Sequence, residues 1–301
     1  MPLKNLIAAT FSPMNPDFSL NLNAIKPYGA FLKRNRVSGA FINGSTADFV
    51  SLTTAERKSI VDAWSKDKPS DFYLVNHVGH CNLKEAVTLA EHAVDKVDAI
   101  AALAPFYFKL NTLKQLIEYC KTIAAAAPQL PFYYYHIPVL TGADFKMIDF
   151  IEKATQEIPN FAGLKFTKND LIDYKYCLDF KKPSSNILFG VDEIFLSSLS
   201  LGAQGWVGST YNHLAPLYIN IKEAFENNDF ERAADLQKKS MLFVDILNRY
   251  GGYNGVAKGF MKTLGVDCGP SRFPHITLEN STYVKIVESL EKENILQYTS
   301  R

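Results

Sequence analysis

The feature that most restricts the possible folds of this chain is a regular alternation of strand-like and helix-like runs. Eight short runs, rich in β-branched, aromatic and small residues, recur mostly at intervals of roughly twenty-five to thirty-five residues, the length of one strand–helix unit. Between them apolar residues return every three or four positions, most clearly at 83–94 and 113–125. We predict strands at residues 6–10, 39–43, 72–77, 99–104, 132–136, 161–166, 187–190 and 205–208.

Strict alternation is typical of a (β/α)8 barrel or of a doubly wound parallel sheet. The repetition is even and no Gly-x-Gly-x-x-Gly follows the first strand, which favours an α/β TIM barrel. We expect a single domain with the barrel over about residues 1–228 and a C-terminal helical extension over about 229–301. Helical patterns at 217–227, 230–250, 255–264 and 278–292 predict helices that cover the barrel or build a subunit contact.

The composition narrows the class of protein. The 301 residues are 47% hydrophobic and 21% charged, enough for a large buried core, and a net charge of +1 argues against a nucleic-acid or polybasic membrane role. No apolar run approaches the length of a membrane span, and the apolar stretch at the start is too short for a signal peptide. The four cysteines form no Cys-x-x-Cys pair, which is typical of small core residues in a reducing compartment. We therefore expect a cytoplasmic protein.

One lysine stands in a strand-like run that is otherwise small and apolar. Residues 161–167 are apolar except for Lys165 and Thr167. Burial disfavours the ammonium form of a lysine, and a neutral amine is the nucleophile that Schiff-base chemistry on a carbonyl requires. The alternative is a lysine on an edge strand whose long side chain reaches the surface.

The active site of a TIM barrel lies at the carboxyl ends of its strands. Hydroxyl groups, one amine and a carboxylate pair follow the predicted strands, and neighbouring glycines allow backbone N–H groups to approach a ligand. The candidate site residues at this rim are Ser45, Thr46, Tyr107, Tyr135, Lys165, Thr167, Gly190, Asp192, Glu193 and Ser209.

Two of these residues should meet. The strands at 132–136 and 161–166 are sequential and should pair, so Tyr135 and Lys165 come close if both side chains point into the barrel. A phenol beside the amine can move protons during imine formation and bond cleavage. A purely structural role for Tyr135 stays open, because tyrosine is common in strands.

The turn with Ser45 and Thr46 and the pair Asp192 and Glu193 each allow two interpretations, one as a ligand-binding site and one as a helix cap. The turn after the second strand, with Ser45 and Thr46, offers successive N–H groups and two hydroxyls to a carboxylate, or forms a polar loop that caps the next helix. Asp192 and Glu193 bind a ligand, or cap a helix that begins at Ile194.

The histidines do not predict a metal centre. His77 and His80 have a metal-like spacing, with His92 further along. His77 ends a strand, however, the spacing is not that of a helical pair, and no acidic ligand is adjacent. We expect neither a metal nor a cofactor.

Taken together, the motifs resemble those of the pyruvate-dependent class I aldolase superfamily that includes N-acetylneuraminate lyase and dihydrodipicolinate synthase. The resemblance extends over essentially the whole chain, and five motifs occur in the same order. They are Gly44-Ser45-Thr46, Tyr133-Tyr134-Tyr135-His136-Ile137-Pro138, Gly163-Leu164-Lys165, Gly190-Val191-Asp192-Glu193 and Gly208-Ser209-Thr210-Tyr211-Asn212.

One position favours the lyase branch of this superfamily. The synthases resemble one another in an arginine two residues after the proline of the tyrosine motif, whereas this chain has Leu140. The resemblance therefore implies a Schiff-base aldolase that cleaves N-acetylneuraminate (sialic acid) reversibly to N-acetylmannosamine and pyruvate. The alternatives are an aldolase for another 2-keto-3-deoxy sugar acid, a catalytically silent ligand-binding relative, and a zinc-dependent aldolase.

The resemblance also implies roles for the candidate residues. Lys165 forms the Schiff base, Tyr135 moves the proton, and the Ser45–Thr46 turn holds the keto-acid carboxylate. Tyr107 resembles an aromatic residue that reaches the site of a neighbouring subunit, which implies a homotetramer. Contacts to the sugar chain are implied for Thr167, Gly190, Asp192, Glu193 and Ser209.

The chain departs from the family pattern directly after this turn. The family usually has glycine and glutamate there, whereas this chain has Ala47 and Asp48. If the position of Ala47 requires a positive φ, alanine costs about 1 kcal/mol there.

Overall fold

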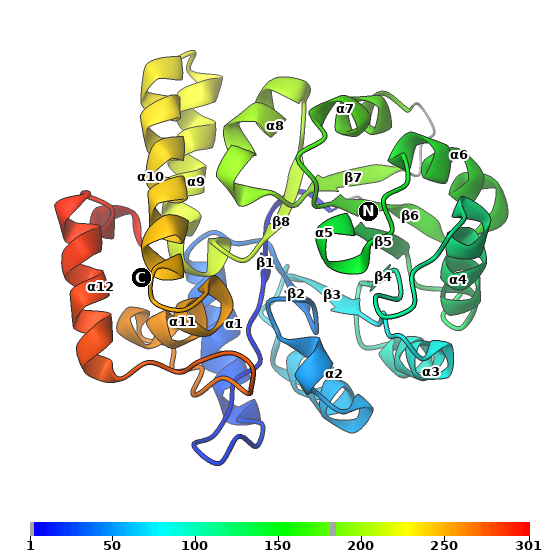
Figure 1. Cartoon of the computed structure of the whole chain (residues 1–301), viewed down its shortest axis with the longest axis horizontal. Helices are drawn as coiled ribbons and strands as arrows, with labels where there is room; N and C mark the ends of the chain where they lie inside the picture. The colour runs from blue at the N-terminus through cyan, green and yellow to red at the C-terminus, as the bar shows by residue number, and fades with distance from the viewer. Residues whose placement is uncertain (1–2, 181–184) are drawn as a thin grey trace.

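The computed structural model describes residues 3–180 and 185–301, and eight parallel strands close into a barrel (Figure 1). Each strand pairs with its neighbours in sequence, and β1 closes the barrel against β8. The predicted TIM barrel is confirmed, and every predicted strand lies within one residue of an observed one. The strands are β1 (Asn5–Ala9), β2 (Gly39–Ile42), β3 (Tyr73–His77), β4 (Ala99–Leu103), β5 (Phe132–His136), β6 (Phe161–Phe166), β7 (Asn186–Phe189) and β8 (Gly205–Gly208).

Helices connect the strands and surround the barrel (Figure 1). They are α1 (Ile25–Arg34), α2 (Thr54–Asp67), α3 (Leu83–Ala93), α4 (Leu113–Ala125), α5 (Pro138–Thr141), α6 (Met147–Glu157), α7 (Leu171–Asp179), α8 (Phe195–Leu201) and α9 (Tyr211–Glu226). Short 3₁₀ helices are η1 (Leu22–Ala24), η2 (Phe49–Ser51), η3 (Asp192–Ile194), η4 (Met261–Leu264) and η5 (Leu296–Tyr298). Within the described part of the chain, no helix has the length and apolar character needed to cross a membrane.

Local sequence explains where helices begin. A reciprocal capping box joins Thr53 and Glu56 at the start of α2, as their spacing predicts. Asn82 also caps α3, through the N–H of Lys84, but Glu85 does not complete a box and instead accepts from the Thr54 hydroxyl of α2. Glu85 thus bonds to a neighbouring helix and not to the N-cap residue of its own helix.

The alternation of side chains along the strands produces two cores. Side chains that point into the barrel, such as Ile7, Val75 and Leu188, form an inner core. Side chains that point outward pack against the helices and form a larger outer core, which includes Leu74 and Phe132. The inner core fills the barrel below the carboxyl ends of the strands, so a ligand can enter only from that end.

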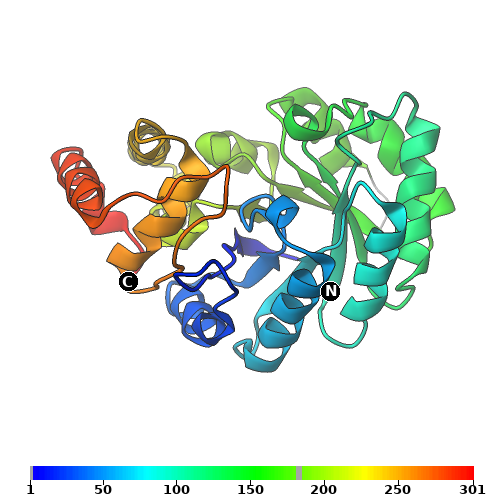
Figure 2. The ribbon, with the colours of Figure 1, turned by 60° about the horizontal axis from the view of Figure 1, so that its bottom comes forward.

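The C-terminal extension contains α10 (Phe230–Asn248), α11 (Tyr253–Phe260) and α12 (Asn280–Lys292), gathered on one side of the barrel (Figure 2). α9 and α10 lie side by side (Figure 1). The helix predicted at 217–227 begins six residues earlier, at Tyr211, with Pro216 inside it. A kink at Leu214, where φ is −129°, accommodates the proline, and so the proline does not mark the start of the helix.

Candidate active site

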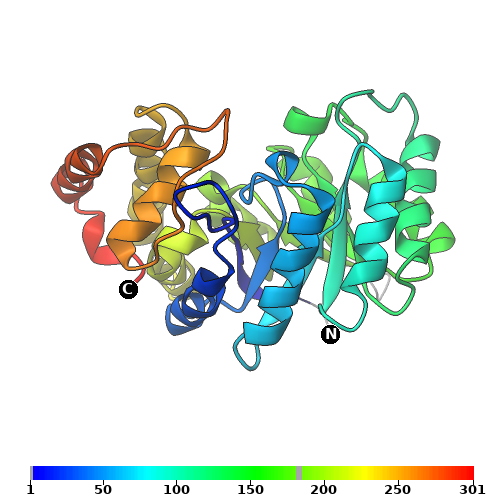
Figure 3. The same cartoon turned by 90° about the horizontal axis from the view of Figure 1, so that it is seen from below.

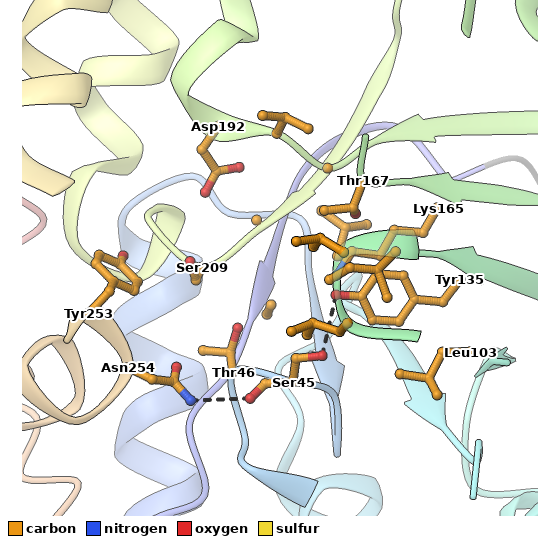
Figure 4. Close-up of a pocket in the computed structure, with 18 of the residues that line it drawn as sticks. Ser45, Thr46, Leu103, Tyr135, Lys165, Thr167, Asp192, Ser209, Tyr253 and Asn254 are labelled. Atoms are coloured by element: carbon orange, nitrogen blue, oxygen red, sulfur yellow. Dashed lines mark hydrogen bonds between the residues drawn. The ribbon is translucent and has the colours of Figure 1, made fainter. Parts of the chain in front are cut away.

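A pocket of about 970 Å³ opens at the carboxyl ends of the strands (Figure 4). Nine of the ten candidate site residues line it, and Tyr107 does not. The nine residues come from five strand ends that lie far apart in the sequence. They are Ser45, Thr46, Tyr135, Lys165, Thr167, Gly190, Asp192, Glu193 and Ser209.

Lys165 lies inside the barrel. Its strand, β6, is paired on both sides, and the residue is only 4% exposed, so the alternative of an edge-strand lysine that reaches the surface is wrong. The amine lies 3.9 Å from the centre of the Tyr135 ring and 4.4 Å from that of Phe41. No hydrogen bond or ion pair with another described residue holds the amine. It is therefore a buried amine that is available to an electrophile.

A bulge between β5 and β6 sets the register at the site. Phe132 pairs with Phe161, but Tyr133 pairs with Gly163, so Tyr135 lies opposite Lys165. Without the extra residue Tyr135 would pair with a side chain that points out of the barrel. Only glycine fits at 163, because a Cβ there would come within 1.9 Å of the Asn186 carbonyl oxygen.

The Tyr135 hydroxyl points toward the turn that follows β2. It lies 3.5 Å from the Ser45 hydroxyl, at the outer limit of a hydrogen bond (Figure 4). The ring itself packs edge-on against Phe41 and His77, which fixes its position. The phenol thus lies between the amine and the Ser45–Thr46 turn.

The Ser45–Thr46 turn has free donors. The carbonyls of Gly44 and Ser45 accept from N–H groups three to five residues further along the chain, which closes the turn. The N–H groups of Ser45 and Thr46 themselves donate to no other described residue. Two free N–H groups and two hydroxyls form a concave site suited to a carboxylate. The turn does not cap α2, since that cap is Thr53.

The positive φ considered for Ala47 occurs at the next residue, Asp48, instead. Ala47 is not among the residues with positive φ, whereas Asp48 has φ +52°. An aspartate tolerates this conformation better than most residues do. The substitution of alanine for the family's glycine therefore carries no penalty of this kind, and Ala47 instead accepts a hydrogen bond from the Ser12 hydroxyl at 2.9 Å.

Asp192 caps neither η3 nor α8, contrary to one of the two readings. No side-chain cap is present at either helix. Instead the buried carboxylate crosses to the end of β8, where one oxygen accepts from the Thr210 N–H at 3.0 Å and from its hydroxyl at 2.6 Å. Gly208 makes room, because a Cβ there would lie 1.8 Å from the second oxygen.

Several polar atoms at this end of the pocket are buried without a partner among the described residues. They include the second Asp192 oxygen and the Thr167 hydroxyl. Burial raises the pKa of Asp192 and, together with the charge of Asp192, that of Glu193. Groups that protein atoms leave unpaired are suited to the hydroxyls of a ligand.

Tyr107 lies outside the pocket, in the loop after β4. It is 76% exposed, and its ring contacts that of Phe108, which is 83% exposed. In the single chain neither aromatic reaches the site.

His77 and His92, two of the three histidines considered as metal ligands, have structural partners. His77 is fully buried, with Nδ1 2.9 Å from the Asn43 carbonyl and Nε2 accepting from the Leu103 N–H at 3.3 Å. Burial, and then the charge of Arg57, lower its pKa well below the usual value. His92 contacts Asp62 instead. Among residues 3–180 and 185–301, no three histidine, cysteine or acidic side chains gather in a way that suits a metal ion.

One wall of the pocket consists of residues that the sequence did not single out. They come from the C-terminal extension and from the loop that joins α11 to α12: Val244, Asn248, Tyr253, Asn254, Pro274 and His275. The only signal is the Gly251-Gly252 pair before α11, where both residues have positive φ and direct the helix start into the site. Leu140 also lines the pocket, so an apolar side chain stands where the synthases have arginine.

Comparison with known proteins places this site in a family. The model of the dihydrodipicolinate synthetase family matches residues 2–293. The chain belongs to this family. Within it, human N-acetylneuraminate lyase is 40% identical over 277 residues, which are 90% of this chain and 87% of the human protein. N-acetylneuraminate lyase A of Xenopus laevis is 38% identical over 90% of each chain.

Solved structures of the same family are similar throughout. N-acetylneuraminate lyase from Proteus mirabilis superposes with a TM-score of 0.92 at 33% identity, over 98% of this chain and 100% of that one. The sialic acid aldolase of Aliivibrio salmonicida gives 0.93 at 32% identity, over 99% of both chains. The resemblance of the five motifs to this family is thereby confirmed.

Proposed function

We propose that this protein is a class I aldolase that cleaves N-acetylneuraminate reversibly to N-acetylmannosamine and pyruvate. The observation that carries the proposal is the buried, unpaired amine of Lys165, with the Tyr135 hydroxyl and the Ser45–Thr46 turn beside it. The choice of sugar acid is supported by the lyases that are 38–40% identical over 90% of this chain.

Lys165 acts as the nucleophile. Its Nζ adds to the C2 carbonyl of the open-chain sugar acid, and loss of water gives a protonated imine. The electron pair of the C3–C4 bond then moves toward the imine nitrogen, while the C4 hydroxyl loses its proton and becomes the aldehyde of N-acetylmannosamine. Protonation of the remaining enamine at C3 and hydrolysis release pyruvate and restore the free amine. A sialic acid aldolase from Ruminococcus gnavus, 25% identical, is described as a catalytic lysine mutant.

The neighbouring groups divide proton transfer and binding between them. Tyr135, together with the substrate's own carboxylate, takes the C4 hydroxyl proton. The free N–H groups of Ser45 and Thr46 hold that carboxylate. At the opposite end of the pocket, contacts to the hydroxyl chain of the sugar come from Thr167, Gly190, Asp192, Glu193 and Ser209.

The assembly and location are part of this proposal. A homotetramer is supported by Tyr107 and Phe108, two exposed aromatic residues in the loop after β4 that a second subunit would cover. A cytoplasmic location is supported by the four cysteines, all of which are free and three of which are buried.

Reduction with borohydride tests the proposal. The protein is incubated with N-acetylneuraminate and borohydride, and intact mass and peptide mapping locate the adduct. A three-carbon, pyruvate-derived remnant on Lys165 would show both the nucleophile and the cleaved bond. Trapping of added pyruvate but not of N-acetylneuraminate would point to a different sugar acid. No adduct with either compound would contradict the aldolase mechanism.

A further inference from the structure

We propose that Asn254 and His275, both in the C-terminal extension, are positioning residues for the substrate carboxylate. They act through the Ser45–Thr46 turn and need not touch the substrate themselves. The inference rests on the proposed function in one respect, that the ligand carries an α-keto acid carboxylate.

The contact that carries the inference joins α11 to the turn. The side-chain amide of Asn254 donates to the Ser45 carbonyl oxygen at 3.2 Å (Figure 4). In a planar trans peptide, the Ser45 carbonyl and the Thr46 N–H point in opposite directions. Holding the carbonyl toward α11 therefore fixes the Thr46 N–H away from α11. This N–H is one of the two free donors of the turn.

His275 holds Asn254 in turn. Its Nε2 lies 3.4 Å from the Asn254 amide nitrogen and 3.7 Å from a carboxylate oxygen of Asp48. An unprotonated Nε2 accepts from the amide and so orients it toward Ser45. Asp48, one of the two residues that depart from the family pattern, closes the same turn through its own N–H, which donates to the Ser45 carbonyl at 3.0 Å. The Asn254 amide and the Asp48 N–H thus donate to the same carbonyl, that of Ser45.

Separate contacts anchor the loop that carries His275. The Arg272 guanidinium forms an ion pair with Glu56 at the start of α2 and donates to the Ser51 carbonyl at 2.8 Å. Lys258 donates to the Pro270 carbonyl at 2.6 Å. The Arg272 contacts join the loop to the segment that follows β2, and the Lys258 bond joins it to α11, beside which the loop runs in Figure 3. The loop is thus held in place without Asn254, and the Asn254 amide is free to donate to the Ser45 carbonyl of the turn.

The test is the variant Asn254→Leu, which keeps the size of the side chain and removes the donor. Losing one hydrogen bond to the turn should raise the KM for N-acetylneuraminate about fivefold. The pyruvate concentration that half-saturates borohydride trapping should rise equally, because both ligands share the carboxylate. The kcat should stay within about twofold, since the Lys165 amine is unaffected.

Gln297→Met is the matched control. Its side-chain amide also donates to a backbone carbonyl at 3.2 Å, that of Asn294, but far along the C-terminal extension and outside the pocket. It should leave both constants unchanged. An equal effect of both substitutions, or a fall in kcat with unchanged pyruvate trapping by Asn254→Leu, would overturn the inference.

A second variant separates positioning from folding. His275→Leu should raise the same two constants by less, about twofold, and the double variant should match Asn254→Leu alone, because His275 acts only through Asn254. If the effects of the two single substitutions add in the double variant, His275 does not act through Asn254 and this part of the inference is wrong. If the unaltered protein traps neither compound, the proposed function and this inference fail together; if it traps both and the variants are unchanged, only the inference fails.

Discussion

The pocket has two walls of different construction. The barrel wall presents Lys165 and Tyr135 from neighbouring strands, each paired on both sides. The C-terminal wall presents Asn254 and His275, which reach the site through single side-chain contacts between segments more than 200 residues apart. Strands paired on both sides hold the reactive side chains in fixed positions. The added C-terminal wall instead positions the groups that bind the substrate. Substitutions in the first wall should therefore change the chemistry, and those in the second should change binding.

The largest effect is expected for Lys165→Met. Without the amine no imine forms, so kcat should fall by at least about a thousandfold. The fold should survive, because the amine makes no hydrogen bond in the described structure and its burial is unfavourable. Steady-state kinetics and urea unfolding measure the two quantities.

Lys258→Met is the control for this variant. Lys258 is also buried, and burial lowers its pKa to about 8, so its amine is a second candidate nucleophile. It lies outside the pocket, however, with its amine bonded to Pro270. Trapping should continue in this variant. An adduct that maps to Lys258 would contradict the assignment of Lys165.

The next effect is expected for Tyr135→Phe. Loss of the hydroxyl removes the proton carrier, and kcat should fall by about 10² to 10³ with little change in KM. Tyr133→Phe is the matched control, since Tyr133 stands on the same strand and face, with its hydroxyl 3.2 Å from Asn186 and away from the pocket. Near-equal rates for the two variants would show that the phenol of Tyr135 has only a structural role.

The difference between the walls also explains what the sequence could predict. Strands recur along the sequence, and in a barrel their carboxyl ends meet at one rim. The sequence therefore predicts that Lys165, Tyr135 and Ser45 lie at the same rim. The bulge that brings Tyr135 opposite Lys165 was not predictable, because Gly163 is needed for the approach of the Asn186 backbone and not for any local pattern.

The C-terminal wall has no such period. Asn254 and His275 stand in segments whose spacing reveals only helices and a loop, and their contact with the turn depends on how the extension packs. Asp192 is a similar case: its sequence neighbours suggest a helix cap, but its partner is Thr210, eighteen residues away. Contacts of this kind come from tertiary packing, which local patterns do not encode.

A smaller effect is expected for Glu193→Gln at the far end of the barrel wall. If this carboxylate binds the hydroxyl chain of the sugar, the KM for N-acetylneuraminate should rise about tenfold, a typical effect of losing a charged hydrogen bond. Pyruvate lacks that chain, so its trapping should be unaffected and serves as the internal control. Equal weakening for both compounds would mean that Glu193 acts on the common, carboxylate-binding half of the site.

The smallest effect concerns the ion pair that joins the loop of the C-terminal wall to α2. The Arg272 guanidinium lowers the pKa of Glu56 to about 2, from 4.5 in the unfolded chain. A lowered carboxyl pKa stabilises the fold above the unfolded value, and this stabilisation is lost as the pH falls from 4.5 toward 2. Glu56→Gln keeps a capping-box residue but removes the charge, so at pH 7 it should lower the free energy of unfolding by about 1 kcal/mol. Urea unfolding of both proteins should show this gap narrowing between pH 5 and pH 3. A gap that is independent of pH would assign the loss to packing, and the C-terminal wall would then be held without help from this charge.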